Sequence, residues 1–185
     1  MRQASPNEMY RDNTLIPAEA IRLAALGTLA CAPLRYAELA REVRAFASRI
    51  TGPSLDILGS SIELLRTEGL VAPASESDDD AVLEITEAGR LELKELMYAN
   101  VRSPMDGVSK LVLTLKLRFL HLLEPSERRE QVDRILETCE TELARLNDLR
   151  GRYAREPGHL VDWLVHDIGQ TEARIAWLRE LYERV

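Results

Sequence analysis

The stretch TEGLVAPASESDDDAVLEITEAG, Thr67 to Gly89, decides the fold of this chain. It contains two short apolar runs, LVAP and AVLEI, whose length and composition favour two short β-strands. Gly69, directly before the first run, is a natural residue to end a helix. Between the runs lies SESDDD, Ser75 to Asp80, with four acidic residues. We therefore expect the end of a helix and then a β-hairpin with a strongly acidic loop.

Three helical segments precede this hairpin. Pro17 stands at a favourable first-turn position of the first segment, PAEAIRLAALGTLAC, and Pro33 ends it. The second segment covers about residues 36–50. Ser54 can cap the third, which ends before Gly69 and whose apolar residues recur at steps of three and four. Three helices followed by a hairpin predict a winged helix-turn-helix with a two-stranded wing.

The second half of the chain consists of helical segments. Thr86 can cap the first, EAGRLELKELMYAN. Val108 to Leu123 is apolar on nearly every side, so we expect it to be buried at the centre of the fold. Two further segments, divided at Pro157-Gly158, repeat apolar residues at alternating steps of four and three. This repeat predicts two long helices paired as an antiparallel hairpin.

A pair of helices has little hydrophobic core of its own, so a second copy of the chain is expected to cover what remains exposed. The expected homodimer interface follows the repeating positions: Val132, Leu136, Cys139, Leu143, Leu164, Ile168, Ile175, Leu178 and Tyr182. Trp163 and Trp177 lie fourteen residues apart beside this stripe. They suit packing in the core or the dimer, or alternatively the aromatic wall of an effector pocket.

The expected fold class is therefore mainly α, in three parts. Residues 1–14 are polar and unpatterned, which is typical of a disordered arm. Residues 15–102 are expected to form the N-terminal winged helix-turn-helix DNA-binding domain with its two-stranded wing. Residues 103–185 are expected to form a C-terminal long-helix dimerisation domain.

The charge balance argues against a basic nucleic-acid domain. The net charge is −7, with nine basic and fourteen acidic residues through Arg90 and fifteen and seventeen after it. Any DNA contact must therefore come from a local basic patch. The acidic loop allows three interpretations: it points away from DNA into solvent, it opposes the phosphates, or it holds a cation or a basic partner. It lacks the spacing and central glycine of an EF-hand loop.

The candidate DNA contacts lie on the second and third helices. Arginines on or beside the second helix could neutralise phosphates, and residues near helix starts could add contacts. The same arginines could equally be solvated surface residues. The face of the third helix opposite its apolar stripe has no basic residue but could touch base edges. The candidate set is Arg35, Tyr36, Arg41, Arg44, Thr51, Ser54, Ile57 and Ser60.

Nothing in the sequence favours catalysis. There is no nucleophile, phosphate-binding or metal-protease motif, so an enzyme, a cofactor and a metal site are not expected. His159 and His166 lie about 10 Å apart along a helix, too far to share a metal ion. His121 is expected to be a core histidine, and Cys31 and Cys139, without CxxC spacing, buried free thiols in a reducing cytosol. No segment suits a membrane span or a signal peptide, so the expected location is cytoplasmic.

Several blocks of the sequence resemble the PadR-like transcriptional regulators: LGTLACAPLRYAELAREV, TGPSLDILGSSIELLRTEGLV and LEITEAGR. The block LKLRFLHLLEPSERREQ and the Trp-bearing last helix are similar to the dimerisation region of their AphA-like, virulence-activator branch. The resemblance covers roughly residues 15–185. It implies a bacterial regulator, dimeric through its C-terminal helices, that inserts the third helix of each winged domain into successive major grooves. Gly59 and Glu63 stand where the family commonly has a tyrosine and a basic or polar residue.

The sequence therefore predicts a DNA-binding transcriptional regulator whose partners are double-stranded DNA and a second copy of itself. A small-molecule effector is a further candidate partner. Two alternatives stay open. The chain could be a winged-helix protein with weak or lost DNA binding that acts through protein contacts, or a ligand-sensing helical dimer.

Overall fold

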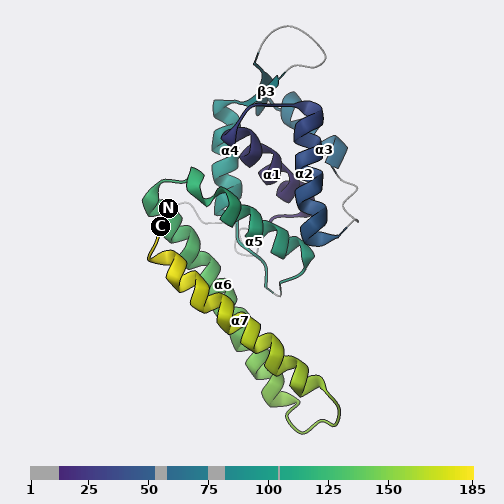
Figure 1. Cartoon of the computed structure of the whole chain (residues 1–185), viewed down its shortest axis with the longest axis vertical. Coiled ribbons are helices and arrows are strands. Elements are labelled where there is room, and N and C mark those ends of the chain that lie inside the picture. The colour runs from purple at the N-terminus through teal and green to yellow at the C-terminus, as the bar shows by residue number, and fades with distance from the viewer. Residues whose placement is uncertain (1–12, 53–57, 75–81, 104) are drawn as a thin grey trace, which may run out of the picture.

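The computed structural model describes residues 13–52, 58–74, 82–103 and 105–185 (Figure 1). Most of the expected N-terminal arm, the candidate residues Ser54 and Ile57, and the acidic loop lie outside the described residues. The elements are α1 (Pro17–Cys31), β1 (Leu34–Arg35), α2 (Tyr36–Thr51), α3 (Leu58–Thr67), β2 (Val71–Pro73), β3 (Val82–Ile85), α4 (Glu87–Tyr98), α5 (Gly107–Phe119), the 3-10 turn η1 (Leu120–Leu122), α6 (Pro125–Arg152) and α7 (Leu160–Tyr182).

The predicted fold class is confirmed: a winged helix-turn-helix precedes a pair of long helices (Figure 1). The described part of the wing is β2 and β3, which pair antiparallel with Val71 opposite Ile85. A third strand, β1, was not expected. It pairs with the other side of β3, so that the strand order among the described residues is β1-β3-β2. A strand of two residues is too short to produce an alternating pattern in the sequence.

The base of the wing is fixed by hydrogen bonds from Thr86. Its Oγ1 accepts a bond from the backbone N–H of Gly89 at 3.1 Å, which confirms the predicted cap of α4. The same hydroxyl donates to the carbonyl oxygen of Gly69 at 2.8 Å. Gly69 has a φ of +72°, the left-handed conformation that commonly ends a helix and that glycine adopts without strain. One side chain thus joins the end of α3 to the start of α4.

Helix α5 lies at the centre of the fold, as its apolar sequence predicted. It packs against α1 and α2, and Leu111, Leu115 and Phe119 are buried. The Phe119 ring lies against Gly27 of α1, where a Cβ atom would overlap the ring. Although the proposed domain division places α5 with the dimerisation part, its packing partners belong to the winged part.

Lys116 of α5 is fully buried beside the end of α4. Its Nζ donates to the carbonyl oxygens of Met97 and Leu96, the latter at 3.5 Å. Arg134 of α6 donates from Nη1 to the carbonyl oxygen of Tyr98 at 3.1 Å, and its guanidinium lies 5.1 Å from the centre of the Tyr98 ring. The last carbonyls of a helix have no partners within it. Two cations from neighbouring helices therefore supply donors to the end of α4.

Helices α6 and α7 pair as the predicted antiparallel hairpin, which projects away from the winged part (Figure 1). The buried side chains of α7 are Leu164, Ile168, Thr171, Ile175 and Leu178, and those of α6 include Val132, Ile135, Cys139 and Leu146. The far end of the hairpin has a small cluster of its own, around Leu146, Leu164 and Ile168. The rest of the seam is continuous with the main core.

Two expectations about single residues are wrong. Cys31 is exposed, whereas Cys139 is buried as expected. His121 is also exposed, because η1 turns it out of the core that α5 enters. The apolar run identifies the buried helix but not the point at which the helix ends.

Packing at Gly27 yields a stability prediction. Gly27→Ala should lower the free energy of unfolding by about 1–3 kcal/mol, because the added methyl group overlaps the Phe119 ring in a filled core. The matched control is Gly151→Ala in α6, where a Cβ has open space. That variant should be unchanged or more stable by up to about 1 kcal/mol. Urea unfolding of both variants tests the prediction, and equal stabilities would contradict it.

Lys116 yields a pH prediction. Burial, together with the positive charge of Arg134, lowers the pKa of Lys116 from 10.5 to about 7. The unfolded chain therefore holds this proton more tightly than the folded chain does. The cost in folding free energy of burying the charged lysine is complete below pH 7, and it decreases as the pH rises to about 10.5. Between pH 7 and 9.5, the free energy of unfolding of the wild type should rise relative to that of Lys116→Met.

Urea unfolding across this range measures the difference. Lys110→Met, which removes an exposed lysine from the same helix, should follow the wild-type profile. Parallel profiles for the wild type and Lys116→Met would show that Lys116 does not titrate in this range.

Candidate nucleic-acid interface

The exposed face of α2 carries the strongest basic candidates. Leu39, Val43 and Ala47 bury the opposite face of the helix, which leaves Arg41 and Arg44 exposed. Neither guanidinium forms an ion pair with another described residue. This is the arrangement expected of side chains that are available to phosphates.

The acidic residues of α2 are engaged elsewhere. Glu42 forms an ion pair with Arg118 of α5, with 2.8 Å between Oε1 and Nη2. The Arg118 guanidinium also lies over the Phe46 and Phe119 rings, 4.6 and 5.2 Å from their centres. Glu38 accepts a bond from the backbone N–H of Arg35 at 3.4 Å. The carboxylates that could have paired with the α2 arginines are therefore directed to other groups.

The remaining α2 candidates differ in their surroundings. Arg35 and Tyr36 are exposed at the start of the helix. Thr51 is the last residue of α2, and its hydroxyl donates to the carbonyl oxygen of Ala47 at 3.0 Å. The Thr51 hydroxyl is therefore already engaged within its own helix.

Helix α3 presents a mixed surface. Ser60 lies within the helix, and Ile62 and Leu65 are buried as predicted. Glu63 and Leu64 are exposed, and so is Arg66, which the candidate set did not include. Arg66 stands in the last turn, beside the face that holds Glu63. A basic side chain in the helix that follows the turn was a usable signal.

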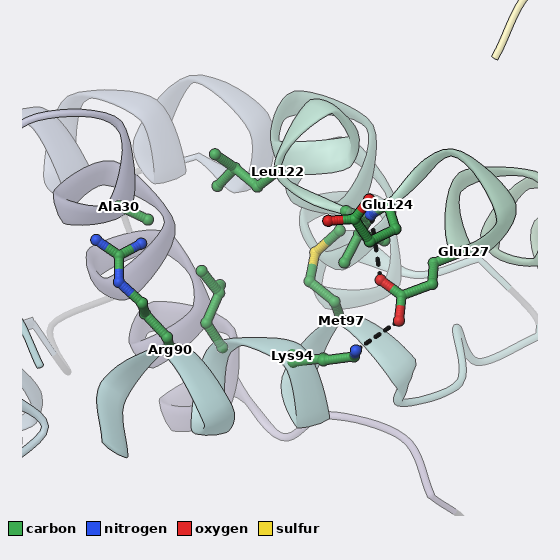
Figure 2. Close-up of a pocket in the computed structure, with 9 residues that line it drawn as sticks. Ala30, Arg90, Lys94, Met97, Leu122, Glu124 and Glu127 are labelled. Carbon is green, nitrogen blue, oxygen red and sulfur yellow. Dashed lines mark hydrogen bonds and ion pairs between the residues drawn. The ribbon is translucent and has the colours of Figure 1, made fainter. Parts of the chain in front are cut away.

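A cavity of about 220 Å³ lies between the C-terminal end of α1, α4 and the start of α6 (Figure 2). Met97 and Leu122 contribute apolar surface, and Arg90 forms no ion pair with a described residue. Lys94 and Glu127 also line the cavity, and Lys94 Nζ lies 2.5 Å from Glu127 Oε1. The hydrogen bond between them raises the pKa of Lys94 and lowers that of Glu127.

Six of the nine residues predicted for a dimer interface are already buried within one chain. Val132, Cys139, Leu164, Ile168, Ile175 and Leu178 are buried between the paired helices or in the main core, and Leu136, Leu143 and Tyr182 are half-buried. The outer face of α7 instead exposes Trp163 by 63% and Trp177 by 44%. The tryptophans therefore do not belong to the core of the single chain.

In the part of the chain that the structure describes, no group of three or more His, Cys, Asp or Glu side chains could hold a metal ion. His159 Nδ1 lies 3.0 Å from Asp162 Oδ2, and His166 Nε2 lies 2.7 Å from the Gln170 amide nitrogen. No described helix is long and apolar enough to cross a membrane.

A known family covers nearly the whole chain. The family model described as "Putative AphA-like transcriptional regulator" matches residues 10–182. Among solved structures, Bacillus subtilis PadR is similar over 91% of this chain and 96% of its own, with 14% identity and a TM-score of 0.35. Its complex with operator DNA matches over 89% of this chain and 98% of its own, also with 14% identity and a TM-score of 0.35. No curated protein sequence matches the chain.

Proposed function

The chain belongs to the AphA-like family of transcriptional regulators, and from this premise we propose that it binds double-stranded DNA as a homodimer. The observation that carries the DNA-binding proposal is the pair of exposed arginines on α2, Arg41 and Arg44, beside carboxylates that are held by other groups. Such arginines neutralise phosphates and fix the register of a helix-turn-helix on the duplex.

In this proposal α2 holds the DNA backbone and α3 enters the major groove. Arg35 and Tyr36, at the start of α2, and Ser60 and Arg66, in α3, are the further candidate contacts. The net charge of −7 leaves no general electrostatic attraction to DNA, so affinity depends on this local patch. The regulator then acts in the cytoplasm, where bacterial DNA is found.

The homodimer that we propose uses the outer face of α7. Trp163 and Trp177 lie seven residues before and after Gln170, on one line along the helix. If two copies of α7 pair antiparallel about Gln170, each Trp163 meets a Trp177, and the small side chain of Ala173 allows the helices to approach closely. Exposed aromatic residues are typical of interface centres, where they bury large areas.

A small-molecule effector is a second proposal, supported by the cavity beside α4. Its apolar wall suits the body of a small organic anion, and the guanidinium of Arg90, which has no ion-pair partner among the described residues, suits the charge. The cavity is lined by α4 of the winged part and by the start of α6, so a ligand there would touch both parts. The alternatives of protein contact alone, or ligand sensing without DNA binding, predict no salt-dependent DNA affinity.

The DNA proposal is tested with the double variant Arg41→Ala/Arg44→Ala. Affinity for the gene's own upstream DNA should fall, and the slope of log affinity against log salt should decrease by roughly 0.9 for each phosphate that is no longer neutralised. Fluorescence anisotropy over a salt series measures both. The matched control, Arg152→Ala/Arg155→Ala, removes the same charge from exposed positions at the far end of the hairpin and should keep the wild-type slope. Wild-type protein that shows no binding at low salt would overturn the proposal.

The dimer proposal is tested with Trp163→Glu/Trp177→Glu. A charge in a desolvated helix interface should convert the dimer to a monomer of unchanged helicity, as seen by sedimentation velocity and circular dichroism. Leu91→Glu, which alters an apolar residue that is 59% exposed on α4, should remain dimeric. A dimeric tryptophan variant would exclude this face as the interface.

A further inference from the structure

Cys31 and His121 form a thiol–imidazole pair on the surface of the winged part. Cys31 is the last residue of α1 and His121 lies in η1, and the two are 90 positions apart in the sequence. Cys31 Sγ lies 3.7 Å from His121 Nε2, within the range of a hydrogen bond to sulfur. Both side chains are exposed, so a small solute can reach the sulfur.

The other ring nitrogen of His121 determines what Nε2 can do. Nδ1 lies 3.1 Å from the carbonyl oxygen of Arg118, and a carbonyl oxygen can only accept. Nδ1 therefore carries the hydrogen, and in the neutral ring Nε2 is left as an acceptor that faces the thiol. A nucleophile, a base within reach and a third group that orients the base are the usual arrangement of an activated side chain.

Two arginines hold this arrangement in place. Arg128 donates from Nη2 to the carbonyl oxygen of His121 at 3.1 Å and from Nε to that of Leu123 at 2.7 Å. Arg118, whose carbonyl orients the ring, has its own side chain fixed by the ion pair with Glu42 of α2. The backbone of η1 is therefore anchored on both sides of the imidazole.

We propose that Cys31 is a peroxide-reactive thiol and that His121 accepts its proton during the reaction. The sulfur attacks one oxygen of hydrogen peroxide, an S–O bond forms and the O–O bond breaks. The thiol proton passes to Nε2 and then to the departing hydroxide, which leaves as water. Sulfur is oxidised to the sulfenic acid and peroxide is reduced, with no further reactant.

Cys139 is not the thiol that resolves this product. It is fully buried in α6, and burial raises the pKa of its thiol, so it is both inaccessible and poorly nucleophilic. A free low-molecular-weight thiol instead condenses with the sulfenic acid to a mixed disulfide and water. A second molecule of that thiol then releases Cys31 and leaves as the disulfide of the small thiol.

The reaction can be followed on the full-length chain with hydrogen peroxide, with dimedone as the trap for sulfenic acid and intact-mass detection. Wild type and Cys139→Ser should gain one dimedone adduct, and Cys31→Ser none. His121→Ala should react at least about tenfold more slowly, in line with the loss of a proton acceptor. Added imidazole should restore the rate of His121→Ala but not produce an adduct in Cys31→Ser. N-acetylcysteine with the same imidazole measures the background effect.

Chemical rescue separates proton transfer from a structural role, because imidazole cannot repair a displaced helix. His121→Gln provides a second variant that keeps a polar side chain without a base, and it should match His121→Ala. An adduct on Cys139, a wild-type rate in either His121 variant, or no rescue above the N-acetylcysteine background would overturn the proposal.

Discussion

The rest of the structure depends on how the C-terminal end of α4 is satisfied. The carbonyl oxygens of Leu96, Met97 and Tyr98 end a helix in the interior, where an unpaired polar group costs about 1–3 kcal/mol. Lys116 and Arg134 supply the donors. The cost is a desolvated ammonium group, which is why the pKa of Lys116 is lowered to about 7. Because the donors come from α5 and α6, one local requirement joins three helices and ties the hairpin to the winged part.

Most of the fold could be predicted from the sequence because its signals are local. The Thr86 cap and the end of a helix at Gly69 depend on a few neighbouring residues, and the structure confirms both. The apolar spacing of α2 and α3 is also local, and Leu39, Val43, Ile62 and Leu65 are buried. Strand β1 has only two residues and is defined by its pairing with β3. Its own sequence is too short to show the alternating pattern of a strand. Lys116 appeared in the sequence only as an interruption of an apolar run, since burial of a lysine needs acceptors that another helix supplies.

The candidate site was less predictable, because its properties depend on contacts between distant residues. Whether Arg41 and Arg44 are available depends on where Glu42 points, and Glu42 pairs with Arg118, 76 positions away. The ion pair with Glu42 also fixes the side chain of Arg118, and the carbonyl oxygen of Arg118 orients the His121 ring. The spacing of apolar residues in α2 predicts which face of the helix is buried. It does not predict which groups the charged side chains of α2 pair with. Arg66, by contrast, was visible in the sequence and was missed because the α3 candidates were drawn from the first turns of the helix.

The two faces of α7 show that one seven-residue spacing fits two different rows of side chains. A seven-residue spacing joins Leu164, Thr171 and Leu178, and the same spacing joins Trp163, Gln170 and Trp177 one residue earlier. One residue is a rotation of about 100° on a helix, so the two rows face different directions. The first row is buried against α6 within the chain, and only the second remains open. The seven-residue spacing alone therefore does not say which of the two rows is buried within the chain. The hairpin, by closing over the aliphatic row, leaves the aromatic row as the face that a second copy can cover.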